Sequence, residues 1–297
     1  MSIVTVIGAG TMGNGIAHAF AARSFTVRLV DVRSEALTDA LATIGKNLDR
    51  QRKKELIDES EKTATLERIS TYTQLDEAVA DASLVVEAAT ENPAIKTQIF
   101  EKLSTLCEEN TILATNTSSI SITKIAAATS RPQQVIGMHF MNPVPVMPLV
   151  EIINGYRTVP RVTEGVVSIV HELGKTPLVA NDYPGFVANR ILMPMINEAI
   201  IALHEGVAEV HAIDQIMKLG MAHPMGPLKL ADFIGLDVCL SIMRVLHEGL
   251  GKDKYAPCPL LVNMVEAGRL GIKSGEGFYD YEAGPKSEQV AERFIRS

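Results

Sequence analysis

The stretch Ile3-Val4-Thr5-Val6-Ile7-Gly8-Ala9-Gly10-Thr11-Met12-Gly13 lies at the start of the chain and decides its fold. A run of β-prone residues leads into glycines spaced GxGxxG, and the alanine-rich segment Met12–Arg23 follows with helical spacing. The first glycine allows a tight turn, the second lets the backbone approach a pyrophosphate, and the third lets helix and strand pack closely. The stretch therefore predicts the first strand–turn–helix unit of a dinucleotide-binding domain.

Asp31 supports this interpretation and indicates which dinucleotide binds. It directly follows the second predicted strand, Thr26–Val30, at the distance of ~20 residues from the glycines that such a site requires. A carboxylate there accepts hydrogen bonds from the ribose hydroxyls of NAD and repels the 2′-phosphate of NADP. Arg33 leaves NADP open as an alternative, because a nearby arginine accommodates that phosphate. We expect NAD, bound by Gly8, Gly10, Thr11, Met12, Gly13 and Asp31.

The first half of the chain alternates strand-like and helix-like segments. Further candidates for buried strands are Ser83–Glu87, Thr111–Thr115 and Val135–Met138, and helical segments such as Pro93–Cys107 lie between them. This alternation predicts an α/β fold, a Rossmann-type doubly wound sheet with helices on both faces.

The polar stretch Ser34–Arg68 is too long for one ordinary crossover helix, and we expect it to insert a pair of helices. A basic cluster falls near the tip of this predicted pair: Arg50, Arg52, Lys53 and Lys54. Taken alone, such a cluster is typical of a solvated helix face.

The second half of the chain has a different character. Beyond Asp182-Tyr183-Pro184-Gly185, helical patterns dominate, in Phe186–Gly206, Glu209–Leu219, Pro227–Gly249 and Pro259–Ala267. Pro184 and Gly185 favour a hinge or a helix start. We predict an NAD-binding domain in residues 1–183 and an all-α C-terminal domain in residues 184–297. The polar end, from about Glu282 to Ser297, is expected to be a loosely held helix or a frayed tail.

Composition limits the classes of function. The 297 residues are 46% hydrophobic and 21% charged, which is typical of a globular protein with a full core. A formal net charge of -7 argues against non-specific nucleic-acid binding. No segment has the ~18–20 consecutive apolar residues of a membrane-spanning helix, and no targeting series precedes Ile3, so we expect a cytoplasmic protein. Three cysteines without metal-type spacing predict reduced thiols and no metal site.

Three later segments carry the candidate chemistry: Thr115-Asn116-Thr117-Ser118-Ser119, His139-Phe140-Met141-Asn142-Pro143 and Pro148-Leu149-Val150-Glu151-Ile152. The first two directly follow predicted strands. Ligands of an open α/β sheet bind outside the carboxyl ends of its strands, so these polar residues are expected to converge beside the nicotinamide.

These segments, together with the glycine motif and DYPGFVANR at residues 182–190, resemble the L-3-hydroxyacyl-CoA dehydrogenase family. The resemblance runs from Met1 to about Tyr281 and is greatest to bacterial members that act on 3-hydroxybutyryl-CoA. HFMNPVPVMPLVE, residues 139–151, and DYPGFVANR are far more specific than the glycine motif. The resemblance implies interconversion of (S)-3-hydroxyacyl-CoA and 3-oxoacyl-CoA with NAD(H), on short acyl chains.

His139 matches the catalytic histidine of the family, and a histidine is a residue type suited to removing a hydroxyl proton as hydride leaves. Glu151 matches the carboxylate that orients this histidine. Ser118 and Asn189 match the substrate-positioning pair, which implies a site in a cleft between the domains.

The resemblance assigns further binding residues. The nicotinamide half of the cofactor site is lined by Glu91, Lys96, Asn142 and Lys273. Lys54 matches a lysine that contacts the CoA phosphates, and Asn47 stands where some members have a CoA-contacting serine. The chain departs from the expected family pattern at Thr115, Pro148, Arg269 and Ile272. These departures concern substrate fit, CoA affinity and local packing, not the proton-transfer pair.

Two other functions compete with this interpretation. One is a catalytically inactive NAD-binding relative of the same fold, because fold alone does not imply function. The other is a dehydrogenase of a small free hydroxy acid, although such enzymes generally use a lysine base in the helical domain. The apolar segments Ile191–Ile201 and Ile234–Met243 suggest either a homodimer formed through the C-terminal domain or simply a helical core.

Overall fold

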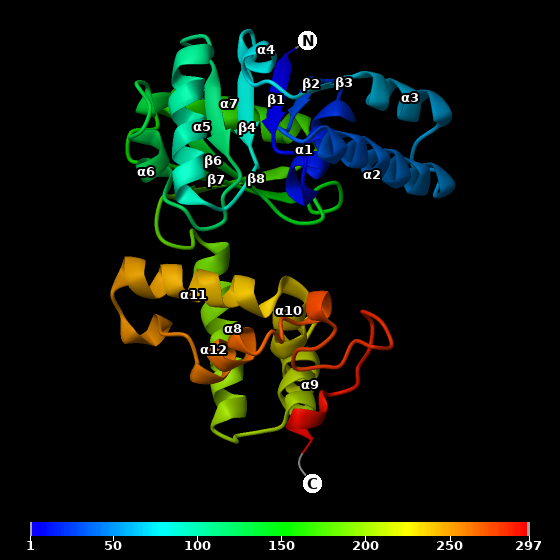
Figure 1. The fold of residues 1–297 in the computed structure, drawn as a ribbon, viewed down its shortest axis with the longest axis vertical. Helices are drawn as coiled ribbons and strands as arrows, with labels where there is room; N and C mark the ends of the chain where they lie inside the picture. Colours follow the sequence, from blue (N-terminus) through cyan, green and yellow to red (C-terminus); the bar gives the residue numbers. More distant parts are fainter. Residues whose placement is uncertain (1, 296–297) are drawn as a thin grey trace. The chain divides into compact units, whose positions relative to one another are not determined.

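The computed structural model describes residues 2–295 and divides into two compact units, of which the first ends at Tyr183 and the second begins at Pro184 (Figure 1). The first unit is built on an eight-stranded sheet in the order β3-β2-β1-β4-β5-β6-β7-β8. Its strands are β1 (Ile3–Ile7), β2 (Thr26–Val30), β3 (Ile69–Tyr72), β4 (Leu84–Glu87), β5 (Ile112–Thr115), β6 (Val135–Phe140), β7 (Leu149–Asn154) and β8 (Thr176–Asn181). The order reverses between β1 and β4, and a reversal of this kind is where an open α/β sheet binds its ligand.

Helices cover both faces of this sheet, which confirms the predicted doubly wound fold (Figure 1). They are α1 (Thr11–Ala21), α2 (Ser34–Lys53), α3 (Glu59–Glu67), α4 (Asp76–Val79), α5 (Pro93–Leu106), α6 (Ile122–Ala126) and α7 (Pro160–Glu172). Val86 and Ala114 share one buried apolar cluster with residues of α1, α2 and α7. Because side chains alternate along a strand, their neighbours Glu87 and Thr115 point to the other face, where both bond Lys96 of α5.

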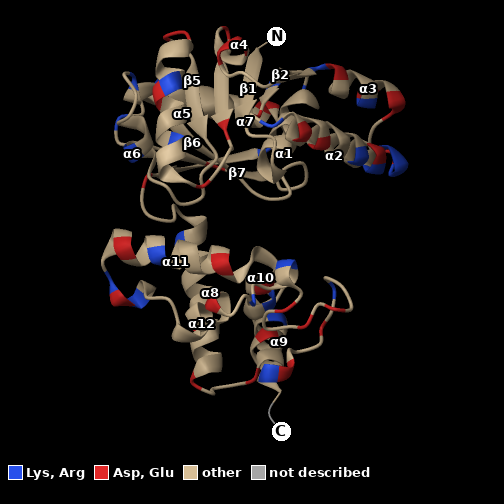
Figure 2. Ribbon diagram, in the orientation of Figure 1, with Lys and Arg blue, Asp and Glu red and all other residues tan. Residues whose placement is uncertain are grey.

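The predicted pair of helices is present as α2 and α3. Its long helix buries one narrow face at intervals of three or four residues, through Leu37, Ala40, Ile44 and Leu48. The second helix starts at a capping box, in which Asp58 and Glu61 satisfy each other's backbone N–H groups. The basic cluster lies at the C-terminal end of α2, where Figure 2 shows it in blue.

Three strands were not expected from the sequence, and low burial explains this for two of them. Strand β8 has no buried residue, with Leu178 58% and Val179 52% exposed, so it lacks the apolar signal of a core strand. Strand β3 buries only Ile69. In contrast, β7 is well buried but runs antiparallel to β6, against the parallel pattern of the rest of the sheet.

The second unit is helical, as predicted, with α8 (Ala188–His204), α9 (Val210–Gly220), α10 (Pro227–Ile234), α11 (Leu236–Leu250) and α12 (Pro259–Glu266). The expected single helix Pro227–Gly249 is two helices, because Gly235 has φ +103° and breaks the hydrogen-bond ladder.

The segment after α12 folds back onto the helices of the second unit. Asp232 of α10 accepts hydrogen bonds from the backbone N–H groups of Phe278 and Tyr279 and from the Tyr281 hydroxyl. Burial raises the pKa of Asp232 to about 6. The polar end is not a frayed tail in its described residues, because a bridge between Tyr279 and Val290 anchors it. The expected helix is limited there to the short 3-10 helix η4 (Glu292–Phe294).

Within residues 2–295, no helix is long and apolar enough to cross a membrane. In the same residues, no group of three or more His, Cys, Asp or Glu side chains is placed to hold a metal ion.

Candidate active site

The glycine motif forms the turn between β1 and α1 for steric reasons. Gly8 has φ +98°, and a Cβ there would lie 2.6 Å from the carbonyl oxygen of Ala88. A Cβ on Gly13 would lie 1.7 Å from the Gly8 carbonyl oxygen, so only glycine allows this helix to begin so close to the strand. Gly10 faces open space, and α1 has no side-chain cap. Its first N–H groups are therefore suited to a pyrophosphate.

Asp31 is held at the rim of this turn. Its Oδ2 accepts a hydrogen bond from Ala9 N at 2.9 Å, and its Oδ1 accepts one from Arg33 N at 3.0 Å. The Arg33 guanidinium lies 3.7 Å from Oδ1 and is 70% exposed. The fixed carboxylate beside the glycine turn fits the ribose of NAD.

His139 and Glu151 are directly opposite each other in the antiparallel pairing of β6 and β7. Both side chains are buried, and His139 Nδ1 lies 2.7 Å from Glu151 Oε2. When Nδ1–H donates to the carboxylate, the neutral ring carries its lone pair on Nε2. The pair is therefore arranged for proton exchange through Nε2, with the resulting imidazolium stabilised by the carboxylate.

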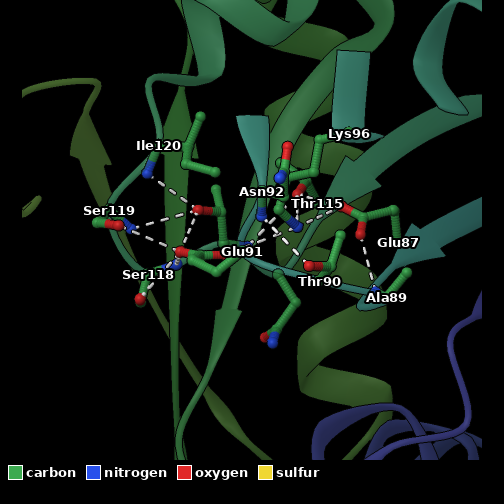
Figure 3. Close-up of polar contacts among 12 residues, drawn as sticks. Glu87, Ala89, Thr90, Glu91, Asn92, Lys96, Thr115, Ser118, Ser119 and Ile120 are labelled. Carbon is green, nitrogen blue, oxygen red and sulfur yellow. Dashed lines mark hydrogen bonds and ion pairs between the residues drawn. The ribbon is translucent and has the colours of Figure 1, made fainter. Parts of the chain in front are cut away.

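A buried ion pair underlies the ends of β4 and β5 (Figure 3). Lys96 is 1% exposed, and its Nζ lies 2.6 Å from Oε2 of Glu87, which is 0% exposed. Thr115 donates to the same oxygen at 2.8 Å, and Ala89 N donates to Oε1 at 2.8 Å. Thr115 is thus accommodated within a satisfied polar network.

Glu91 organises the loop that follows β5 (Figure 3). Its Oε1 accepts hydrogen bonds from Thr117 Oγ1 at 2.6 Å, Ser118 N at 2.9 Å, Ser118 Oγ at 3.1 Å and Ser119 Oγ at 3.2 Å. Its Oε2 lies 3.7 Å from Lys96 Nζ. The predicted residues Glu91, Lys96 and Ser118 are therefore brought into one cluster.

The loop between β6 and β7, the strands that carry His139 and Glu151, is held by a lysine from another part of the chain. Lys175, which precedes β8, donates to the carbonyl oxygens of Val144 at 2.6 Å and Met147 at 2.7 Å. Val144 packs so closely on α1 that a Cβ on Gly15 would lie 2.9 Å from it. Asn142 is the second residue of this loop and is exposed, a position compatible with its predicted contact to the cofactor.

The remaining predicted residues lie elsewhere. Asn47 and Lys54 are on α2 and at its C-terminal cap, and Lys54 is exposed. Asn189 is a buried residue of α8 in the second unit. Lys273, also in the second unit, lies 2.5 Å from Asp237 through its Nζ.

Comparison with known proteins identifies the chain. Residues 3–183 match the family described as 3-hydroxyacyl-CoA dehydrogenase, NAD binding domain, and residues 185–281 match its C-terminal domain. The chain belongs to the 3-hydroxyacyl-CoA dehydrogenase family. It therefore contains an NAD-binding domain, as the glycine motif and Asp31 predicted.

Individual 3-hydroxyacyl-CoA dehydrogenase family members are similar over nearly the whole length. A probable 3-hydroxybutyryl-CoA dehydrogenase of Bacillus subtilis is 56% identical, over 94% of this chain and 97% of the relative. The mitochondrial hydroxyacyl-coenzyme A dehydrogenase of Rattus norvegicus is 42% identical, over 94% of this chain and 91% of its own. The crystal structure of (S)-3-hydroxybutyryl-CoA dehydrogenase from Ralstonia eutropha has a TM-score of 0.93 at 48% identity, covering 95% of this chain and 99% of that one.

Glu87 and Lys175 were not predicted as site residues of this 3-hydroxyacyl-CoA dehydrogenase family member, and Asn116 was named only as part of its segment. Asn116 accepts a hydrogen bond from Phe140 N at 2.9 Å and so ties the end of β5 to the strand of His139. The available signal was chemical, because a glutamate inside the buried strand segment Leu84–Glu87 requires a partner.

Replacing Asp31 tests how this protein selects NAD over NADP. In Asp31→Asn, we expect the Kd for NADH to rise about tenfold, since a charge-assisted acceptor for the ribose hydroxyls is lost. The Kd for NADPH should rise less, because repulsion of the 2′-phosphate is also lost. Both values are obtained from cofactor fluorescence, with Asp39→Asn on the exposed face of α2 as the control. An unchanged ratio of the two affinities would contradict the assignment.

Proposed function

We propose that the protein is an NAD-dependent dehydrogenase that interconverts (S)-3-hydroxybutyryl-CoA and acetoacetyl-CoA. The observation that carries the proposal is the buried pair of His139 and Glu151, 2.7 Å apart near the carboxyl end of β6 in an NAD-binding sheet. The identities of 56% and 48% to relatives named 3-hydroxybutyryl-CoA dehydrogenases support the short substrate.

In the oxidative direction, His139 takes the proton of the 3-hydroxyl group as the C–H bond at the same carbon breaks. Bound NAD supplies the acceptor for the departing hydride. The products are the 3-oxo thioester, the reduced cofactor and the imidazolium form of His139. Glu151 stabilises that imidazolium and keeps the ring in the tautomer that can accept a proton at Nε2.

Ser118 and Asn189 are proposed to position the oxygen atoms of the substrate. Ser118 is suited to this role because Glu91 fixes both its N–H and its hydroxyl group. The role of Asn189, on α8, rests on the family resemblance, as does the wider role of residues 184–297 in substrate binding and dimerisation.

The basic end of α2 is proposed to bind the CoA phosphates. Arg52 is already paired with Glu59 at 2.8 Å, so its charge is partly compensated. Lys54 is exposed at the helix cap, and Asn47 lies about two turns before it on the same helix. A cation on a flexible stem at this position suits a phosphate ligand.

A cytoplasmic location is part of the proposal. Cys107, Cys239 and Cys258 are buried free thiols. Unpaired cysteines suit a reducing compartment.

Turnover with a defined thioester tests the reaction. We expect the purified protein to oxidise NADH with acetoacetyl-CoA, and His139→Gln to lower kcat by about 10²–10⁴-fold because the proton donor is lost. NADH binding by the variant should stay close to that of the wild type, which controls for folding. Near wild-type turnover in His139→Gln would disprove the role of the base, and turnover of free acetoacetate as fast as of its CoA ester would disprove the substrate class.

Lys54→Met tests the CoA site. We expect KM for acetoacetyl-CoA to rise about fivefold with little change in kcat, because one exposed charge contact to a phosphate is lost. The KM for acetoacetyl-N-acetylcysteamine, which has no phosphate, should not change. Lys46→Met, another exposed lysine of α2, is the matched control. Equal effects on both thioesters would contradict a phosphate contact.

Dimerisation through the second unit is also proposed. Ile216 and Leu219 lie three residues apart on α9 and are 59% and 82% exposed, a surface that a second copy would cover. Light scattering should give twice the chain mass of 32.1 kDa. Leu219→Glu should shift the population toward the single chain, and a wild-type protein that scatters as one chain would refute the dimer.

A further inference from the structure

The cluster at the ends of β4 and β5 has an unbalanced charge. Lys96 lies 2.6 Å from Glu87 but 3.7 Å from Glu91, so its ammonium group is matched mainly by the buried Glu87. Glu91 is the outer member of the cluster, with its side chain 43% exposed. Two carboxylates and one ammonium group sum to one formal negative charge, which we place mainly on Glu91 because it is the carboxylate farther from Lys96. Figure 3 shows the positions of the three side chains.

The position of Glu91 in the sheet gives this charge a target. In a doubly wound sheet, the strands on either side of the reversal bind the two halves of the dinucleotide. The glycine turn and Asp31 follow β1 and β2, on the adenosine side. Glu91 follows β4 on the opposite side of the reversal, which is the nicotinamide side.

We propose that Glu91 acts as an electrostatic selector of the cofactor's redox state and shifts the relative affinity of the site toward NAD⁺ and away from NADH. The nicotinamide ring carries a positive charge only when oxidised. A nearby carboxylate whose charge Lys96 compensates only in part therefore stabilises the oxidised ring, and it has no opposite charge to attract in the reduced one. The inference rests on NAD binding within the proposed function and does not require any particular acyl substrate.

Glu91 and Glu151 oppose each other in this scheme. As a hydroxyacyl substrate is oxidised, the positive charge disappears from the nicotinamide ring and appears on His139, which has taken the hydroxyl proton. Glu91 favours the state before this displacement. Glu151, 2.7 Å from the imidazole, favours the state after it. The two carboxylates therefore set the equilibrium between bound substrates and bound products from opposite ends.

The geometry allows the charge of Glu91 to be separated from its role in holding the loop. All four hydrogen bonds from Thr117, Ser118 and Ser119 reach Oε1, whereas the contact to Lys96 involves Oε2. A glutamine can keep its carbonyl oxygen in the position of Oε1 while it removes the negative charge. The side chain is also exposed enough that the substitution does not disturb the core.

Glu91→Gln should raise the ratio of Kd for NAD⁺ to Kd for NADH about fivefold, the size expected for one charge at a partly solvated site. NAD⁺ binding is measured by calorimetry and NADH binding by fluorescence, both at low salt. The ratio should approach that of the wild type as ionic strength rises. The Kd for ADP-ribose, which has no nicotinamide, should not change. Glu101→Gln, on the exposed face of α5, is the matched control and should leave the ratio unchanged.

A second variant reaches the same charge by another route. Glu87→Gln removes the charged main partner of Lys96, so the ammonium group then compensates Glu91. The ratio of Kd for NAD⁺ to Kd for NADH should therefore rise as in Glu91→Gln, although the hydrogen bonds that the loop donates to Glu91 remain. Equal weakening of NAD⁺ and NADH in Glu91→Gln would show that the residue only holds the loop, and this would overturn the proposal, as would an unchanged ratio. These binding measurements need no turnover, so a failure of the proposed reaction is distinguished from a failure of this inference.

Discussion

The antiparallel pairing of β7 with β6 places Glu151 opposite His139, and the rest of the site depends on this register. Because side chains alternate along a strand, a shift of one residue would send either side chain to the other face of the sheet. The surrounding residues of both strands are buried and cannot make such a shift without exposing the core. The hydrogen bond that fixes the imidazole is therefore maintained by the packing of the whole sheet.

The buried ion pair of Glu87 and Lys96 serves a different purpose. Removing two charges from water costs several kcal/mol per ion, and the attraction between them offsets this only when their remaining hydrogen-bonding groups are also satisfied. Thr115 and Ala89 N supply those bonds to Glu87. The result is a rigid ion pair, with its hydrogen bonds satisfied, next to Glu91. Glu91 can then accept the hydrogen bonds of the Ser118 loop from a fixed position.

Sequence reasoning was most successful where local chemistry dictates structure. The glycine turn could be predicted because a Cβ at Gly8 or Gly13 would collide with backbone atoms. The pair of helices could be predicted because the polar stretch between β2 and β3 is longer than one ordinary crossover helix. Strand β8 could not be predicted, since it is held by pairing with β7 and buries no side chain. The partner of a buried charge is similarly invisible, because Glu87 and Lys96 meet only after strand and helix have packed. The roles of the site residues, Asn189 and Lys273 among them, remain predictions.

Lys175 holds the loop between β6 and β7 through hydrogen bonds to two carbonyl oxygens of the loop, and this has an evolutionary consequence. Every residue type offers the same carbonyl group, so the anchoring does not depend on which side chains the loop carries at residues 145–147. Natural variation or directed mutagenesis can therefore alter these side chains while the fastening of the loop persists. Pro148, at the end of this loop, is held by the same kind of contact, since its carbonyl oxygen accepts a hydrogen bond from Thr176 N.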